Sequence, residues 1–407
     1  MDMKHFTEYS GKVFSVVALS MFSQVTNAIP YTYEGRSLGM GGTIVANADL
    51  ASAAWANPAM LTRQRPSDDF SLLLGVGVFG RDNDELITDI DDFQEANEAR
   101  EAGLAAGTPE GTAQAVQATL DMSNIVAGIE GKDIAVDASA IAAMGIAFDS
   151  FAMAISIRSD TIAAGTVTNL SCQVTTPGCD PTEVTDPDYN IMNVEGVLST
   201  EFGLSFAKAF PLFERKLSVG VTPKIIDLKS LSYQESILTI DSIDSITSPE
   251  NKSDLGTFST VDLGFAYDLS NSFRLGLSIR NLITKEFDVG GQVLNFDTGA
   301  RLGMAYHNRF LTLALDYDLK ENEPLLSNPE FGDLKTQFLA VGAEFNAFDF
   351  AQLRIGAAKN LADNISDGAK DTALTAGVGF WLGFNLDLAL TYTEHSIGGF
   401  LQTGFRF

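Results

Sequence analysis

The sequence lacks any long apolar run after residue 28 that is free of charged and turn residues. A membrane-spanning helix needs about 20 consecutive apolar residues, so this part of the chain can span a membrane only as a β-barrel. Basic residues are also scarce, because 26 Lys and Arg stand against 53 Asp and Glu, which leaves a net charge of −27. A surface this acidic repels phosphate backbones and excludes nucleic acid as a partner.

Residues 1–28 have the pattern of a secretory signal peptide. Two lysines flank the start of an apolar core at 13–22, and small residues end the segment at 26–28. The core is too short for a membrane helix but has the length of a signal sequence. A buried N-terminal helix is the alternative reading. We expect an exported protein whose mature chain begins near Ile29.

Cysteine and histidine are rare, with two and three residues. In an exported chain, the close pair Cys172 and Cys179 predicts a disulfide on an outer loop, with a metal site as the alternative. His395 adjoins Ser396, but neighbours on an extended strand point to opposite faces, so a Ser–His pair is not expected. His307 falls in a short turn, and we interpret both histidines as polar rim residues. We therefore expect no catalytic residue, no metal, no cofactor and no enzymatic activity.

Segments of alternating apolar and polar residues follow one another from Asp69 onward. In the clearest one, Leu311, Leu313 and Leu315 share a face opposite Thr312, which is the pattern of a strand with two different faces. The count is about fourteen, and an even number is expected for a single-chain bacterial barrel. The predicted strands are 69–81, 139–149, 151–168, 189–208, 216–237, 256–268, 273–283, 297–307, 310–319, 335–346, 349–359, 371–382, 384–394 and 398–407.

Short and long connections alternate between these strands. The tight links lie near 148–151, 268–272, 307–309, 346–349 and 381–385, and the long polar links are 82–138, 169–188, 238–255, 284–296, 320–334 and 360–370. Short periplasmic turns and long outer loops give this rhythm in a transmembrane barrel. Aromatic residues gather beside the short turns, as an interfacial girdle would: Phe210, Phe213, Phe348, Phe350, Trp381 and Phe384.

The last strand ends on an aromatic residue. Leu401, Thr403, Phe405 and Phe407 share one face, which is typical of the final strand of an outer-membrane barrel. We expect Phe405 and Phe407 to form the signal for barrel assembly. The barrel-assembly machinery, outer-membrane lipid and lipopolysaccharide are the corresponding expected partners.

The first long link differs from the others because it is rich in Ala, Glu, Gln and Leu. Two helices broken at 107–111 are predicted within 84–126, as an extracellular cap over the barrel mouth. Many carboxylates lie in this and later loops. We read them as a solvated acidic surface rather than as cation sites near lipopolysaccharide: Asp82, Asp84, Glu85, Asp89, Asp91, Asp92, Asp363 and Asp367.

A glycine-rich stretch precedes the first strand. It contains Gly39, Gly41 and Gly42, and is followed by Asn57-Pro58-Ala59. A phosphate loop is excluded, because no strand precedes the glycines and no Lys-Ser/Thr follows them. The stretch resembles the plug region of FadL-type outer-membrane transporters, and the whole chain is more closely similar to the TraF-like conjugal transfer proteins. The resemblance carries over these six residues as a plug motif and identifies no ligand-binding residue.

The resemblance implies a fourteen-stranded barrel with an N-terminal hatch inside it. We therefore expect an all-β fold, a transmembrane antiparallel β-barrel of about 14 strands with an N-terminal plug and a helical first extracellular loop. The parts would be a signal peptide at 1–28, a plug at 29–66, and a barrel at 67–407 that carries the helical insert at about 84–126. The expected location is the outer membrane of a Gram-negative bacterium, as a monomer.

Two functions of different classes follow from the resemblance. The first is a plugged passive channel for hydrophobic small molecules, with such a molecule as ligand. The second is a structural or interaction component of a conjugal transfer or secretion system at the cell surface. An apolar pocket in the lumen that is continuous with a wall opening would favour the first. A plug packed solidly by polar side chains, with no cavity, would favour the second. Asp160, Thr161 and Gly165 mark a candidate kink for a lateral opening in the third strand, with ordinary strand irregularity as the alternative.

Overall fold

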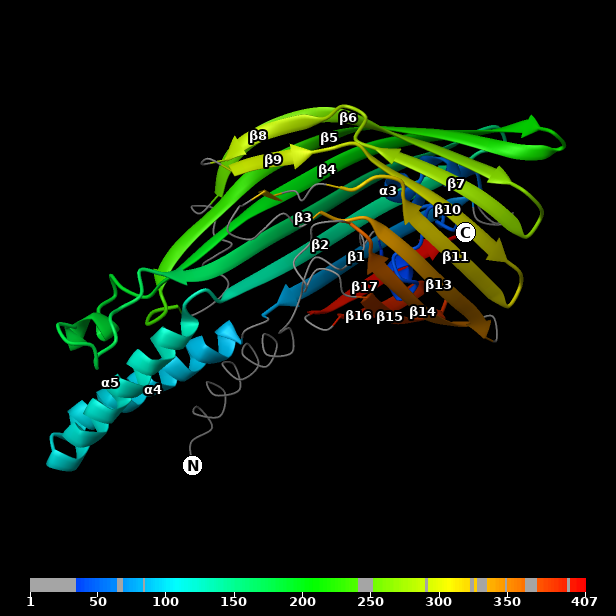
Figure 1. The fold of residues 1–407 in the computed structure, drawn as a ribbon. Coiled ribbons are helices and arrows are strands. Elements are labelled where there is room, and N and C mark those ends of the chain that lie inside the picture. The colour runs from blue at the N-terminus through cyan, green and yellow to red at the C-terminus, as the bar shows by residue number, and fades with distance from the viewer. Residues whose placement is uncertain are drawn as a thin grey trace.

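The computed structural model describes residues 34–63, 69–82, 85–240, 252–289, 292–322, 326–327, 335–347, 350–362, 372–393 and 396–407. Within these residues, fourteen antiparallel strands close into a barrel (Figure 1). The predicted strand number and the helical first loop are confirmed. The predicted signal peptide at 1–28, together with Phe348, His395, Asp84, Asp363 and Asp367, lies outside the described residues.

Each wall strand pairs with its neighbours in chain order. The strands are β1 (Phe70–Arg81), β2 (Asp133–Ala147), β3 (Ala152–Thr168), β4 (Ile191–Leu212), β5 (Arg215–Ser236), β6 (Lys252–Asp268), β7 (Phe273–Arg280), β10 (Gly299–His307), β11 (Leu311–Asp318), β13 (Phe338–Ala347), β14 (Ala351–Asn360), β15 (Thr372–Trp381), β16 (Asn385–Thr393) and β17 (Ser396–Arg406). The remaining elements are α2 (Gly35–Gly39), α3 (Ala53–Ala56), η1 (Pro58–Arg63), α4 (Leu86–Ala106), α5 (Pro109–Ile129), η2 (Pro181–Thr185), β8 (Lys285–Val289), β9 (Gln292–Phe296) and β12 (Leu326–Ser327).

The barrel closes where its first and last strands pair. Ser71 lies opposite Arg406 in the β1–β17 ladder, and Phe70 and Phe407 exchange two backbone hydrogen bonds of 2.8 and 3.1 Å. The rings of these two phenylalanines stack with centroids 5.1 Å apart. The terminal aromatic residue therefore sits on the seam, at the end of the barrel that carries the short turns.

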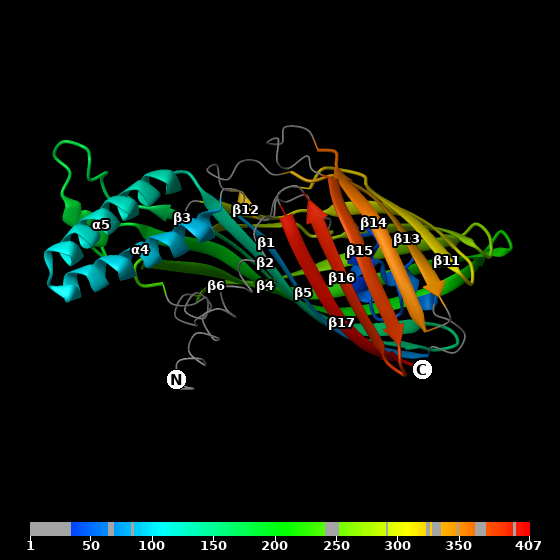
Figure 2. The ribbon, with the colours of Figure 1, turned by 90° about the horizontal axis from the view of Figure 1, so that it is seen from below.

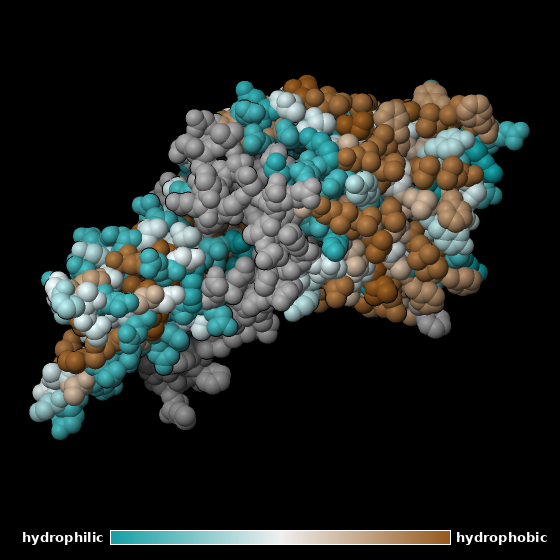
Figure 3. Space-filling view, viewed as in Figure 1, coloured by the Kyte–Doolittle hydropathy of each residue, from teal (hydrophilic) through white to brown (hydrophobic). Residues whose placement is uncertain are grey.

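Alternation along each strand separates a lipid-facing surface from the lumen. On β3, Ile155 and Ile157 are exposed while Ser156 and Arg158 are buried. The exposed apolar side chains form a belt over the half of the barrel that carries the short turns, and the opposite end is hydrophilic (Figure 3). This division is what a transmembrane barrel requires, because its outer face contacts hydrocarbon.

Strands β3 to β5 extend well beyond this belt. They contain 17, 22 and 22 residues, whereas β7 and β11 contain 8. On the long strands, the edge of the belt farthest from the short turns is formed by Ile157, Phe202 and Ile225, which lie opposite one another in adjacent strands. The extension points away from the short-turn end and carries the helices (Figure 2).

Helices α4 and α5 form an antiparallel hairpin. At the base of this hairpin, apolar side chains of both helices pack on the extended strands. Phe93 and Met122 are fully buried in a cluster with Val194 and Tyr233, which lie opposite each other on β4 and β5. Gly103 and Gly111 allow the two helices to approach closely, because a Cβ atom on either would overlap the backbone of the other. No helix in the described residues has the length and apolarity to span a membrane.

The acidic first loop is less solvated than predicted. Asp82 is buried and its carboxylate accepts hydrogen bonds from the backbone N–H groups of Leu86 (2.6 Å) and Ile87 (3.0 Å), at the start of α4. Burial raises the pKa of Asp82. Asp89 pairs with Lys132 at 2.6 Å. Among the described residues, no group of three or more His, Cys, Asp or Glu could hold a metal ion.

Several boundaries differ from the predicted ones. Strand β2 begins at Asp133 rather than at residue 139, because the alternation of Asp133 and Asp137 with Ile134 and Val136 continues the strand into the segment that was predicted to be loop. The link at 284–296 contains the hairpin β8–β9, which pairs with β12 in a separate small sheet. In the loop after β3, Cys172 and Cys179 are joined by a disulfide with Cα atoms 5.6 Å apart.

Residues 34–63 lie inside the barrel (Figure 1), and we call them the lumen segment. Several wall strands present a glycine to it, and six of these glycines form three pairs that are directly opposite in the ladders: Gly220 and Gly264, Gly276 and Gly303, and Gly342 and Gly356. At each of the six, an added Cβ would overlap atoms of the lumen segment. The glycines form a ring on which the backbone of the lumen segment rests directly.

We predict that Gly220→Ala displaces the lumen segment while the wall persists. The new methyl group would overlap the Pro58 carbonyl carbon, and overpacking of this kind costs about 1–3 kcal/mol. Hydrogen exchange should therefore become faster at residues 57–61, with the heat-modifiable electrophoretic mobility of the barrel retained. Gly399→Ala is the control, since its Cβ would meet first the flexible tip of Leu390. Unchanged exchange at 57–61 in Gly220→Ala would contradict the steric account.

Candidate functional site

The lumen segment fills the barrel at the level of the glycine ring with short helical turns. α2, α3 and η1 are joined by turns, and Gly41 and Gly42 have φ values of +72° and +85°, which favour glycine. A Cβ on Gly41 would also lie 2.6 Å from the Val341 carbonyl oxygen. Trp55, Met60 and Leu61 are almost completely buried. The segment therefore obstructs the lumen with a tightly packed core.

Asn57 connects two parts of the lumen segment to the wall. Its side-chain amide donates to the carbonyl oxygens of Val45 (2.8 Å) and Phe265 (3.1 Å), and its Oδ1 accepts from the N–H of Ala59 (3.1 Å). The side chain is fully buried. Only a side chain with both donor and acceptor groups can make this set of bonds, which explains why an asparagine precedes Pro58 here.

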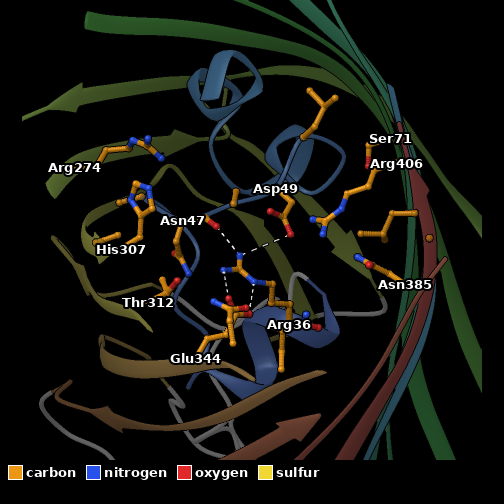
Figure 4. Close-up of a pocket in the computed structure, with 18 of the residues that line it drawn as sticks. Arg36, Asn47, Asp49, Ser71, Arg274, His307, Thr312, Glu344, Asn385 and Arg406 are labelled. Atoms are coloured by element: carbon orange, nitrogen blue, oxygen red, sulfur yellow. Dashed lines mark hydrogen bonds and ion pairs between the residues drawn. The ribbon is translucent and has the colours of Figure 1, made fainter. Parts of the chain in front are cut away.

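Arg36 anchors the lumen segment by charge (Figure 4). Its Nε and Nη2 donate to Glu344 on β13 at 2.7 and 3.1 Å, and its Nη1 donates to the Asn47 carbonyl oxygen at 2.6 Å. Arg354 on β14 also donates to Glu344 (2.8 Å) and to Asp387 (2.5 Å). A bidentate arginine–carboxylate contact is among the stronger hydrogen-bonded pairs in proteins, so this network fixes α2 against the wall.

Wall side chains also satisfy backbone N–H groups of the lumen segment. Asp316 accepts from the N–H groups of Ile44 (2.8 Å) and Val45 (3.0 Å). Thr375 accepts from Gly41 at 2.9 Å, and Gln402 accepts from Gly35 at 2.8 Å. Irregular backbone within a barrel needs such partners, because an unpaired buried N–H is costly.

A layer of buried ion pairs lines the wall on the long-loop side of the lumen segment. Lys224 Nζ lies 2.9 Å from Oε2 of Glu201 and 2.9 Å from Oδ2 of Asp262, and its side chain is fully buried. On β3, Arg158 Nε lies 2.5 Å from Oδ2 of Asp160. These residues have the alternation expected for a polar lumen, but their pairing across three strands could not be read from the sequence.

Farther toward the long loops, the lumen wall becomes apolar. Ile226 and Leu228 continue the inward-facing positions of Lys224 on β5 and are completely buried. They pack with Val197, Phe258 and Phe296, and the ring centroids of Phe258 and Phe296 are 4.9 Å apart. The hairpin β8–β9 supplies Phe287, Leu294 and Phe296 to this group. We call it the apolar cluster.

The candidate kink in β3 is not where the wall is interrupted. β3 pairs without a break with both β2 and β4 from Ala152 to Thr166, and Met192 fills the space beside Gly165. The interruption lies between β4 and β5, where pairing stops after Gly203–Lys224 and resumes at Phe206–Val221. Pro223 stands in this gap, and proline has no N–H group to donate to a ladder.

The structure also places the other residues singled out in the sequence. Gly39 faces Gly377 on β15, and Ala59 rests on Gly220. His307 lies at the end of β10 and borders a cavity on the short-turn side of the lumen segment. Trp381 was expected in the outward-facing aromatic girdle. Its position on β15 instead has the inward-facing register of Ala373 and Thr375. The guanidinium carbon of Arg406 lies 4.6 Å from its ring centroid.

The closed wall and the lumen segment define a fourteen-stranded β-barrel with an obstructed interior. The structure resembles that of the toluene transporter TbuX of Ralstonia pickettii with a TM-score of 0.53 and 14% identity, over 94% of this chain and 100% of that one. It resembles the toluene transporter TodX of P. putida with a TM-score of 0.54 and 12% identity, over 94% and 99% of the two chains. At this identity the likeness establishes the fold.

Residues 54–318 match the family described as F plasmid transfer operon, TraF, protein. This match covers more than half of the chain, and the protein belongs to that family, as the sequence resemblance predicted. No curated protein matches the sequence.

We predict that Asn57→Ala loosens the lumen segment. Three hydrogen bonds are lost and the buried Val45 carbonyl loses its side-chain donor, which costs about 1–3 kcal/mol for each group left unsatisfied. In planar bilayers the variant should show bursts of ion conductance that the unchanged protein lacks. Asn47→Ala is the matched control, because the Asn47 amide makes only a 3.8 Å contact with the Met40 sulfur. Silent Asn57→Ala channels would contradict the role assigned to Asn57.

We also predict that alkaline pH loosens the start of the lumen segment through Glu34. Burial, reinforced by the Asp49 carboxylate, raises the pKa of Glu34 from 4.5 to about 8, although Arg36 opposes the shift. The folded pKa exceeds the unfolded one, so the stabilisation is complete below pH 4.5 and is lost as pH rises through 8. Trypsin cleavage after Arg36, measured relative to cleavage after the exposed Arg309, should therefore increase between pH 7 and 9.

Glu34→Gln should remove this increase, because glutamine stays neutral. Glu98→Gln on α4 changes the net charge equally at a distance from the lumen segment and should behave like the unchanged protein. An equal rise of cleavage in Glu34→Gln would show that another group is responsible.

Proposed function

We propose that this protein is a plugged passive channel for hydrophobic small molecules in the outer membrane of a Gram-negative bacterium. The short-turn end would face the periplasm and the extended strands and helices the cell exterior, as the short-turn rule for such barrels requires. The likeness to TbuX and TodX, which are described as toluene transporters, supports this function.

The apolar cluster is the observation that carries the proposal. The interior of a porin is polar and filled with water, whereas Val197, Ile226 and Leu228 give this lumen an apolar wall near its outer mouth. Phe258 and Phe296 pack on Ile226 and Leu228 and leave them completely buried. An apolar molecule arriving from outside would therefore have to displace part of the hairpin β8–β9, and would then gain about 25 cal/mol for each Å² of apolar surface it buries there. The cluster thus suits capture of hydrophobic solutes rather than of polar ones.

The layers beneath the cluster would prevent free passage along the axis. An apolar solute moving inward meets the ion pairs of Lys224 and Arg158 and then the lumen segment. Passage therefore requires rearrangement of the lumen segment or exit through the wall. The interrupted ladder beside Pro223 lies at the level of the Lys224 ion pairs and is the position in the described wall that best suits such an exit.

A role in conjugal transfer was the alternative, and the family description refers to a transfer operon. That role predicts a plug packed solidly by polar side chains with no cavity. The lumen segment instead has a buried apolar core that includes Trp55, Met60 and Leu61, and it borders a cavity. The geometry of the described residues therefore favours the channel.

We predict that Leu228→Gln weakens the binding of toluene, used as the probe, at least fivefold. Placing an amide in the apolar cluster costs about 1–3 kcal/mol when it finds no partner, and 1.4 kcal/mol corresponds to tenfold in affinity. Equilibrium partitioning of radiolabelled toluene into the detergent-solubilised full chain measures the effect.

Ser232→Gln is the matched control, because Ser232 is exposed on the same strand. It should bind toluene as the unchanged protein does. Equal binding by all three proteins, or no saturable binding by any of them, would refute the proposed ligand site.

A further inference from the structure

The hairpin β8–β9 lies on the apolar wall at which the proposed channel would receive its solute. Figure 1 shows it beside the extended ends of β5 and β6. Within the described residues, its two strands pair with each other and with the short β12, and neither pairs with a wall strand. The contact between the hairpin and the wall is therefore made by side chains and not by a backbone ladder.

The side chains in this contact are apolar. Phe258 lies directly opposite Ile226 in the ladder of β5 and β6. Its ring centroid is 5.6 Å from that of Phe287 and 4.9 Å from that of Phe296. Leu294 is fully buried in the same cluster. Apolar contacts are non-directional, so an apolar molecule can take the place of the hairpin side chains without breaking a hydrogen bond.

Both ends of the hairpin, in contrast, are fixed by hydrogen bonds. At its start, the Asn281 N–H donates to Oδ1 of Asp262 on β6 (2.8 Å). The Ile283 N–H donates to Oγ1 of Thr260, also on β6 (3.0 Å). At its end, the Thr298 hydroxyl donates to the Asn281 carbonyl oxygen (2.8 Å). The residues between these anchors can move away from the wall as a unit, because such a movement leaves the ladder between β8 and β9 intact.

The hairpin differs in this respect from the lumen segment. The lumen segment is tied to the wall by the buried amide of Asn57 and by the ion pair between Arg36 and Glu344. An apolar solute can form neither kind of contact. It can, however, form the contacts that Phe287 and Phe296 make with the wall. Of these two obstructions, the hairpin is the one that an apolar solute can displace by its own binding.

We propose that the β8–β9 hairpin is an internal competitor of the channel's ligand, covering the apolar wall when it is closed and held open by a bound solute. This inference rests on the proposed function, because it concerns the same apolar site. The hairpin and the solute contact the same wall residues, so they exclude each other. The apparent affinity is then reduced in proportion to the fraction of molecules whose hairpin is open. The hairpin thus sets the solute concentration at which the site fills.

Cysteine labelling tests whether the hairpin leaves the wall when solute binds. Leu294 is fully buried, and the two native cysteines are joined to each other, so Leu294→Cys supplies a single thiol on the closed hairpin. Toluene, used as the probe, should increase the rate at which a maleimide labels this thiol in the detergent-solubilised full chain. Ser232→Cys on β5 is the matched control. Ser232 is exposed, so its labelling rate should not depend on toluene.

A second variant tests the same competition by affinity and does not depend on assembly of Leu294→Cys. Phe287→Ala should strengthen toluene binding at least about threefold, because it raises the fraction of molecules whose wall is open. Glu286→Ala, at the exposed neighbouring position, should bind toluene as the unchanged protein does.

The opposite signs would overturn the proposal. Weaker toluene binding by Phe287→Ala, or slowed or unchanged labelling of Leu294→Cys at saturating toluene, would make the hairpin a fixed part of the ligand site and leave the proposed function standing. Absence of saturable toluene binding in every variant would overturn the proposed function and this inference together.

Discussion

The arrangement of the lumen depends on direct contact between two backbones. The lumen segment rests on wall strands whose inward side chain at that level is a hydrogen atom, as at Gly220 and Gly356. Without this contact the segment would stand off from the wall by the width of a side chain. The short hydrogen bonds from Asn57 and to Asp316 could not then form. The polar network between the lumen segment and the wall therefore depends on the close approach that the glycines allow.

The sequence predicted the wall far better than its contents. Two-residue alternation is a local property, so each of the fourteen strands could be recognised from its own residues. The predicted boundaries were wrong where a strand continues into a segment taken as loop, as at the start of β2. The glycine ring left no comparable signal, because its members lie on six strands and become neighbours only after closure. Asn57 was singled out by resemblance, but its partners Val45 and Phe265 are distant in sequence. The packing of the β8–β9 hairpin on β5 and β6 was missed for the same reason.

Different chemistry is stacked along the barrel axis. An apolar cluster lies toward the outer mouth, then a layer of buried ion pairs, then the lumen segment, and finally a polar cavity. Burying the Lys224 ion pairs costs desolvation energy, and such pairs are weak evidence for stability alone. They do, however, fix the positions of three neighbouring strands beside the interrupted ladder. The wall next to Pro223 is thus held by side chains where backbone pairing is missing.

The seam between β1 and β17 imposes an order on folding. It joins residues more than three hundred positions apart, such as Ser71 and Arg406, so barrel closure cannot precede synthesis of the final strand. Contacts of such long range make folding slow. The lumen segment immediately precedes β1 and contacts strands from β2 to β17, so it must be enclosed while the cylinder is still open or as it shuts. The interior is therefore assembled together with the wall, and a nascent barrel that closes early would exclude its own core.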